Sequence, residues 1–209
     1  MSTPANCPNC GAPIRFLWSS AVQTVCEFCH SILVRRDVNL ERVGKVADLP
    51  PDSSPIQIAT EGSYRNRAFQ VVGRILYEYE QGGWNEWHAI FSGSSSGWLS
   101  DAQALYAVSF AAPIAGLPPA ASVQRGQQYN FNGVLYEVTC LTRAHYRGVE
   151  GELPFEYWNK DEVLFADLES HDGRFATLDY SDPQPQLYLG EMVEFDSLGL
   201  KNLRQFEGW

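Results

Sequence analysis

The chain has 209 residues, of which 44% are hydrophobic and 13% aromatic, and this composition excludes a disordered chain. The formal net charge of −10 is uneven: residues 1–45 carry five basic and three acidic groups, and residues 46–209 carry ten basic and 22 acidic groups. An acidic body repels phosphate backbones, so the charge argues against nucleic acid as the main partner.

Two cysteine pairs begin the chain, in the spacing C-x2-C-x15-C-x2-C. Each pair fits a tight turn that points two sulfurs at one position, and two such turns supply the tetrahedral thiolate set that Zn²⁺ prefers. Four thiolates leave no position for water, so we predict a structural zinc ion. Its ligands are Cys7, Cys10, Cys26 and Cys29. An iron centre with the same sulfurs and a redox dithiol are the alternatives.

His30 follows the second cysteine pair in the position that Gly11 occupies after the first pair. We therefore expect His30 to be a turn residue and not a competing ligand. No secretory signal precedes Cys7, and no apolar run has the roughly 18 to 20 residues needed to cross a bilayer. We expect a cytoplasmic protein, because reduced cysteine pairs in that compartment more often hold metal than form disulfides.

Proline-rich seams at residues 46–56 and 112–122 are typical of linkers. They divide the chain into a ribbon at 1–45 and two segments at 57–111 and 123–209. The segments resemble each other weakly, since Glu86 and Glu162 are separated by the same 76 residues as Gly97 and Gly173. An internal duplication and chance similarity between two β-rich stretches both remain open.

Short stretches rich in β-branched and aromatic residues, such as 69–79 and 134–142, predict strands at intervals of about ten residues. We expect hairpin turns at 92–97 and 171–173, a helical turn capped by Asp101, and a short helix over 198–206. The fold class is therefore mainly β: a small N-terminal zinc ribbon followed by two tandem β-barrel-like or sandwich-like units. Whether the two units form one continuous sheet is left open.

The segment WNEWH, residues 84–88, concentrates aromatic and ionisable side chains at the start of a strand. Strand alternation places Trp84, Glu86 and His88 on one face and Trp87 on the other. One interpretation is a core Trp87 beside an aromatic rim. The other is a recognition patch that Trp98 extends from across the hairpin. Our partner-binding candidates are Trp84, Glu86, His88 and Trp98.

No catalytic or cofactor-binding residue is predicted beyond the metal ligands. Cys140 shares strand parity with Tyr136 and Val138, which predicts a small buried hydrophobic residue and not a catalytic thiolate. Several acidic residues lack the spacing typical of acid–base catalysis or of a calcium loop, so we expect them on a solvated sheet face. These residues are Glu162, Asp167, Glu169, Asp172 and Asp179.

The cysteine knuckles, followed by GRILY at 73–77, GWNEW at 83–87 and GWLSD at 97–101, resemble the bacterial domain-of-unknown-function family 4178. The best matching positions are Gly73, Tyr77, Trp84, Glu86, Trp98 and Leu99. The second segment departs from the pattern, with Val163 in place of a tryptophan and Arg174-Phe175 in place of Trp-Leu. The resemblance implies no assigned catalytic residue. It implies an accessory role associated with membrane-stress and polyamine genes.

We therefore expect a non-enzymatic protein in which the zinc ribbon and the β-rich body dock a protein partner, with peripheral membrane association through a membrane-protein partner. One alternative is a nucleic-acid-binding ribbon that uses Arg15, Arg35, Arg36, Arg42 and Lys45. The other is an enzyme acting on a polycationic small molecule, in which case carboxylates line one deep pocket. The sequence leaves the oligomeric state open.

Overall fold

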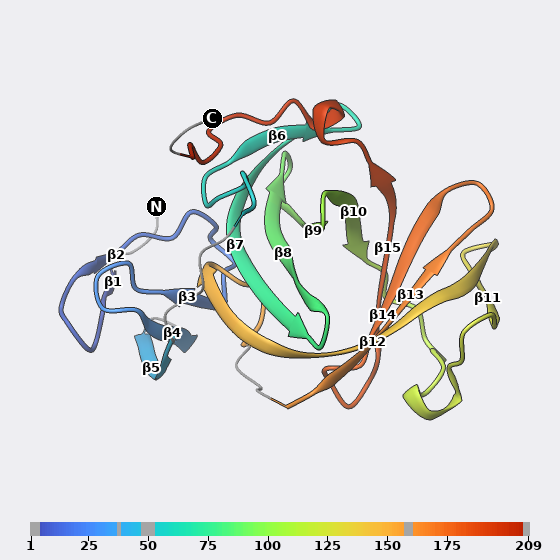
Figure 1. Cartoon of the computed structure of the whole chain (residues 1–209). Helices are drawn as coiled ribbons and strands as arrows, with labels where there is room; N and C mark the ends of the chain where they lie inside the picture. Colours follow the sequence, from blue (N-terminus) through green and yellow to red (C-terminus); the bar gives the residue numbers. More distant parts are fainter. Residues whose placement is uncertain (1–4, 37–38, 47–52, 157–160, 207–209) are drawn as a thin grey trace.

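The computed structural model describes residues 5–36, 39–46, 53–156 and 161–206. The fold is mainly β, as predicted, and consists of a small N-terminal ribbon beside a large sheet (Figure 1). The ribbon contains a hairpin of β1 (Ala5–Asn6) and β2 (Pro13–Ile14). A three-stranded sheet completes it, formed by β3 (Gln23–Val25), β4 (Ser31–Arg36) and β5 (Asn39–Lys45).

Among the described residues, the large sheet has ten strands, and eight of them close into a barrel. The first four barrel strands are β7 (Arg67–Tyr79), β8 (Gly82–Phe91), β9 (Ser95–Ala102) and β10 (Leu105–Ala111). The other four are β12 (Val134–Gly151), β13 (Val163–Glu169), β14 (Arg174–Asp179) and β15 (Gln186–Val193). Short strands β6 (Glu61–Tyr64) and β11 (Gln128–Phe131) extend the sheet beyond the barrel.

The barrel closes through the long strand β12. Its earlier residues pair with β13, as Ala144 does with Val163, and its later residues pair with β7, as Tyr146 does with Tyr77. On the other side, β10 pairs with β15. The two predicted segments therefore share one continuous sheet, each supplying a four-stranded antiparallel meander, and they do not form two separate barrels. This common topology suits an internal duplication, which stays a prediction.

The outer face of each half of the barrel has its own hydrophobic core. On the first half, Ile56 and Leu198 cover residues such as Val71, Trp87 and Val108. On the second half, Ile114 and Leu117 pack against a core that includes Ala166 and Leu178. The described parts of both predicted linkers are thus packed against the barrel, because the sheet has apolar residues outside as well as inside. Residues 47–52 lie outside the described residues.

The two helical expectations are wrong. Asp101 lies within β9, where it pairs with Tyr106 and Asn85 and accepts a hydrogen bond from the Ser54 hydroxyl. Near the C-terminus, the 3₁₀ turn η2 (Phe195–Leu198) precedes irregular chain, and a second turn, η1, spans Ala120–Ser122. The hairpin turn predicted at 92–97 is shorter than expected, because β9 begins at Ser95 and the turn spans only residues 92–94, whereas the turn predicted at 171–173 does connect β13 and β14. Within the described part of the chain, no helix has the length and apolar character needed to cross a membrane.

Candidate functional site: a four-cysteine centre and the barrel interior

Two similar turns carry the four cysteines. In the first, the Cys7 amide donates to the Ala12 carbonyl at 2.8 Å, and the Gly11 amide donates to the Cys7 carbonyl at 2.9 Å. The second turn repeats this pattern, with the His30 amide donating to the Cys26 carbonyl at 2.9 Å. Gly11 has φ +77° and His30 has φ +55°, so His30 is the left-handed turn residue expected from the spacing.

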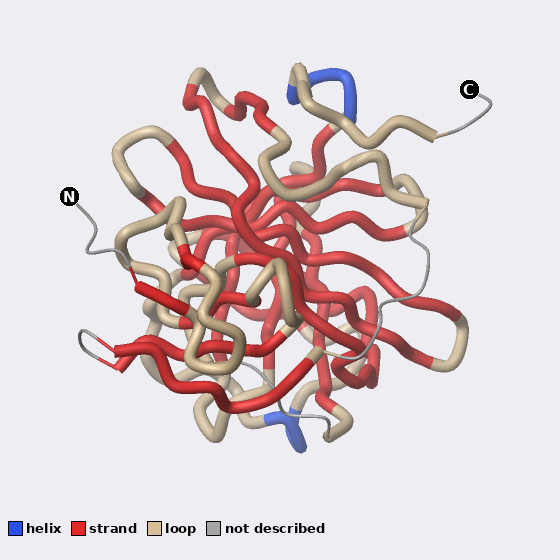
Figure 2. The backbone as a smooth tube through the Cα atoms, turned by 90° about the vertical axis from the view of Figure 1, so that its left-hand side faces the viewer, coloured by secondary structure: helices blue, strands red, loops and turns tan. Residues whose placement is uncertain are grey.

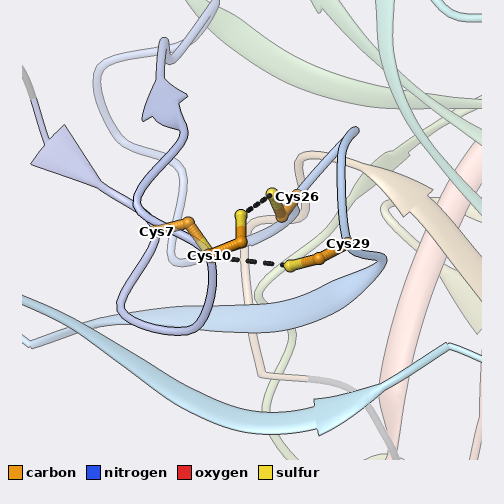
Figure 3. A group of neighbouring side chains, drawn as sticks. All are labelled: Cys7, Cys10, Cys26 and Cys29. Carbon is orange, nitrogen blue, oxygen red and sulfur yellow. Dashed lines mark hydrogen bonds between the residues drawn. The ribbon is translucent and has the colours of Figure 1, made fainter.

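The four sulfurs converge (Figure 3). Cys7 Sγ lies 3.7 Å from Cys29 Sγ, Cys10 Sγ lies 3.8 Å from Cys26 Sγ, and all four sulfurs lie within 4.8 Å of one another. A tetrahedron with metal–sulfur bonds of about 2.3 Å has edges of about 3.8 Å, so the cluster has the dimensions of a four-thiolate metal site. Ser31 Oγ lies 3.2 Å from Cys29 Sγ, close enough to form a hydrogen bond that orients this sulfur.

The ribbon packs against the barrel along the segment that follows β12. The Val22 amide donates to the Leu153 carbonyl at 3.0 Å, and the Leu153 amide donates to the Gln23 carbonyl at 2.9 Å. The carboxyl group of buried Glu152 accepts from the amides of Leu17 and Trp18 at 2.5 and 2.8 Å. Figure 2 is viewed from this side and shows the ribbon in front of the barrel strands.

The interior of the barrel contains all four partner-binding candidates. Trp84, Glu86 and His88 lie on the same face of β8, and Trp98 pairs with His88 from β9. Trp87 lies on the opposite face and is fully buried in an outer core. His88 and Trp98 are also buried. The four residues therefore share one face as the alternation predicted, but they do not form an exposed rim.

Two adjacent chambers occupy the barrel. The inner chamber has a volume of about 40 Å³ and is lined by residues that include Ile75, Trp98, Phe155 and Tyr188. The outer chamber has a volume of about 310 Å³, and its lining includes Trp84, Leu105, Phe175 and Met192. Four residues line both chambers and mark the junction: Glu86, Ser100, Phe165 and Thr177.

The two ends of the barrel differ. At the outer chamber, Leu105 is 63% exposed and Met192 is 42% exposed, so this end opens to the surface. At the other end, the Trp18 ring of the ribbon packs against His88 with ring centroids 5.1 Å apart, and Phe155 stacks on Trp98 at 5.9 Å. Ribbon residue Ile32 belongs to the same core as the interior residues there. The ribbon and the segment after β12 thus close this end.

Four acidic residues line the two chambers, and three of them, Glu86 on β8, Asp167 on β13 and Asp179 on β14, accept hydrogen bonds that fix their carboxyl groups. Glu86 accepts hydrogen bonds from Trp84 Nε1 at 3.0 Å and from Ser100 Oγ at 2.8 Å. Asp167 accepts from Thr177 Oγ1 at 2.8 Å, and Asp179 accepts from the Ser181 amide at 2.8 Å. Glu86 and Asp179 line the inner chamber, and Glu86 and Asp167 line the outer one. The expectation of a solvated sheet face is therefore wrong for Asp167 and Asp179, which line the barrel cavity.

Burial controls the ionisation of these groups. Desolvation raises the pKa of Glu86 to about 8, and the charges of Asp167 and Asp179 add to the shift. Desolvation also raises the pKa of Asp167 to about 6 and raises the pKa of Asp179. At the closed end, burial lowers the pKa of His88 to about 4, so its ring is neutral at pH 7. That ring contacts the Glu152 carbonyl and Ser96 Oγ, each at 2.8 Å.

Cys140 also differs from its prediction, since it is exposed and lines the outer chamber. A β-bulge explains the change. Val138 pairs with Leu168, but Cys140 pairs with Asp167, so Thr139 is an extra residue in β12. The extra residue leaves Val138 in the outer core and turns Cys140 toward the cavity. Strand parity counted from the sequence does not reveal such an insertion.

The five basic residues of the nucleic-acid alternative are only partly available. Arg36 pairs with Glu41 and Glu156, and the Arg35 guanidinium lies 3.9 Å from the centre of the Phe16 ring while donating to the Ser19 carbonyl. Arg15, Arg42 and Lys45 are exposed. The ribbon therefore offers less free positive charge than its composition indicates.

The comparison with known families matches residues 57–195 to the family described as "Domain of unknown function (DUF4178)". No curated protein and no solved structure matches the chain. The matched residues contain all eight barrel strands, and the four cysteines lie before the start of the match. Because the matched residues make up more than half of the chain, the protein belongs to the DUF4178 family.

Proposed function

We propose that this protein is a non-catalytic binding protein whose barrel interior holds a small ligand, with a structural zinc ion in the ribbon. The observation that carries the proposal is the cavity that opens at the Leu105 end and is closed at the other end by the ribbon. Its outer chamber of about 310 Å³ is in the range of small-molecule sites. Its lining combines aromatic walls with a few fixed polar groups, which is the usual composition of such sites.

Zinc is the metal that best suits the four-cysteine cluster, because Zn²⁺ favours tetrahedral thiolate sets with these sulfur separations. The ribbon has a small core of its own, in which Cys7 and Cys26 pack with Ile14 and Leu33, so metal binding would supply much of its folding free energy. Cysteine pairs that hold a metal ion suit a reducing compartment, which supports a cytoplasmic location.

The interior positions of Trp84, Glu86, His88 and Trp98 favour a small ligand over a docked protein as the occupant of this site. A macromolecule cannot reach His88 or Trp98 while the barrel is closed. Glu86 and Asp167 accept hydrogen bonds from the neutral groups of Trp84, Ser100 and Thr177, which hold the two carboxyl groups in place in the cavity. We therefore favour binding over catalysis.

The experiment is an NMR titration of the ¹⁵N-labelled full chain with cationic, neutral and anionic fragments. We expect shift changes at cavity-facing residues such as Ser100 and Thr177. The variant Ala107→Phe fills the outer chamber from β10 and should abolish these changes, whereas Leu135→Phe, at an exposed site on β12, should leave them intact. Shifts confined to the outer surface, or equal binding by both variants, would contradict the proposal.

A protein contact through the ribbon is a second candidate. Phe28 is 69% exposed and Leu17 is 56% exposed, and large apolar side chains grouped on a small module are typical of interaction sites. In a cross-linking experiment with cell extract, Phe28→Ser should lose a partner that Leu135→Ser retains. A partner retained by both variants would argue against the ribbon as its contact surface.

A further inference from the structure

We propose that the barrel interior binds a small organic cation of the alkylammonium class, with the Glu86 carboxylate as its counterion. This inference rests on the proposed function, in which the interior is a ligand site, and it adds the chemical class of the ligand. The ligand enters from the Leu105 end and places its charged nitrogen at the junction of the two chambers.

The first argument is the charge of the cavity. Four acidic residues line the two chambers: Glu86, Asp167, Glu169 and Asp179. Among the described residues, no Lys, Arg or His lines either chamber. Buried carboxyl groups in proteins are either paired with a cation or held neutral by a proton, so a cavity of this composition favours a cationic ligand over an anionic one.

Carboxylates elsewhere on the barrel provide the contrast. On the outer face, Glu150 pairs with Arg74 at 2.9 Å and Glu191 pairs with Arg65 at 2.5 Å. Inside, the hydrogen-bond donors to Glu86 are the neutral groups of Trp84 and Ser100, which fix the carboxyl group without neutralising it. These two hydrogen-bond partners of Glu86 are thus both neutral, and the ammonium group of a ligand would supply a cationic one.

The second argument is the aromatic lining beside this carboxyl group. The Tyr77 and Trp84 rings stack with centroids 4.9 Å apart, and the Phe165 ring meets them edge-on at 4.9 and 5.5 Å. Tyr188 lines the inner chamber opposite. Aromatic rings attract ammonium groups through their quadrupole, most strongly in desolvated sites, and they give an anion no comparable stabilisation.

The third argument is the polarity along the cavity. The residues shared by the two chambers include the polar Glu86, Ser100 and Thr177, and the outer chamber combines the apolar Leu105, Phe175 and Met192 with the acidic Asp167 and Glu169. An alkylammonium ligand matches this lining, because its charged nitrogen meets carboxyl groups and its short alkyl chain meets apolar side chains.

The binding should be linked to protons. The titratable groups that face Glu86 from the surrounding strands are Tyr77 on β7, Asp167 on β13, Asp179 on β14 and Tyr188 on β15. Burial raises the pKa of Glu86 to about 8, and it raises the pKa of Asp167 and of Tyr188 as well. A bound cation favours the ionised carboxylate, so binding releases a proton and becomes tighter from pH 6 to pH 8.

The test is isothermal titration calorimetry on the zinc-loaded full chain with three probes of equal length: 1,4-diaminobutane, 1,4-butanediol and succinate. We expect only the diamine to bind, with tighter binding at pH 8 than at pH 6. Glu86→Gln keeps the shape of the side chain and should weaken diamine binding by about 30-fold or more, the lower limit for losing one partner of a buried charge pair. Glu191→Gln, on the outer face, is the matched control and should bind as the wild type does.

The outcomes separate the two proposals. Equal binding of the diol or succinate at cavity residues would overturn the cation assignment and leave the ligand-binding barrel intact. No binding by any probe would overturn both. Undiminished diamine binding by Glu86→Gln would exclude Glu86 as the counterion. Should that variant fail to fold, Ala107→Phe, which fills the outer chamber, provides the second measurement, and diamine binding unchanged in it would overturn the inference.

Discussion

Glu86→Gln should stabilise the protein at alkaline pH. Glu86 is held in the cavity by Trp84 and Ser100, and burial raises its pKa from 4.5 to about 8. Between pH 4.5 and about pH 8, Glu86 holds a proton in the folded chain that it has lost in the unfolded chain. The free energy of unfolding of the wild type therefore falls as pH rises through this window. Glutamine has the same shape and does not ionise, so the variant should not show this fall in the free energy of unfolding.

The magnitude follows from the shift. Each pKa unit corresponds to about 1.4 kcal/mol, so the shift of Glu86 corresponds to about 5 kcal/mol at most, reduced by whatever water enters the cavity. We expect the two proteins to have equal stability near pH 5 and the variant to be more stable at pH 8.5. The measurement is guanidinium unfolding at pH 5, 7 and 8.5.

Glu191→Gln is a control with the opposite sign. The Arg65 guanidinium lowers the pKa of Glu191, so the wild-type pair stabilises the protein above the ordinary pKa of a glutamate and loses this contribution in acid. This variant should be slightly less stable than the wild type at neutral pH, by an amount within the small range of exposed ion pairs. If Glu86→Gln shows the same pH profile as the wild type, Glu86 is not desolvated in the cavity and the reasoning fails.

Three further predictions concern the rest of the fold. Chelation of the proposed zinc ion should make the amides of residues 5–45 exchange rapidly in hydrogen-exchange mass spectrometry while the β7–β10 amides stay protected, because metal binding would supply much of the folding free energy of the ribbon. Unchanged protection of the ribbon amides would refute this. Burial lowers the pKa of His88 to about 4, so stability should fall as pH decreases from 6.5 toward 4, and thermal unfolding should show a smaller acid loss for His88→Gln. An equal acid loss would point to other groups. Gly190→Ala would put a Cβ 1.9 Å from the Val108 carbonyl oxygen, so we expect a loss of about 2 kcal/mol or more in denaturant unfolding, against little change for Gly44→Ala, whose Cβ would have only an ordinary contact.

The convergence of the four cysteines could be predicted from the sequence because its information is local. The spacing of each pair defines a turn, and Gly11 and His30 mark the same left-handed position in both turns. The alternation of side chains along β8 could also be predicted from the sequence, because residues 84–88 lie within one uninterrupted strand. Both features follow from backbone geometry within a few residues.

The cavity could not be predicted, because it depends on pairings between distant segments. Closure requires β12 to pair with both β13 and β7, and Asp167 and Asp179 become interior residues only when that ring forms. The bulge at Thr139 then reverses the face of Cys140. Glu86 was a candidate from the sequence, but its exposure could not be judged until the opposite wall of the barrel was known.

The most direct test of the cation-binding interior is a crystal structure of the zinc-loaded protein soaked with 1,4-diaminobutane. The predicted result is an ammonium nitrogen within hydrogen-bond distance of the Glu86 carboxylate at the junction of the two chambers. An empty cavity at saturating diamine, or diamine bound only on the outer surface, would contradict it.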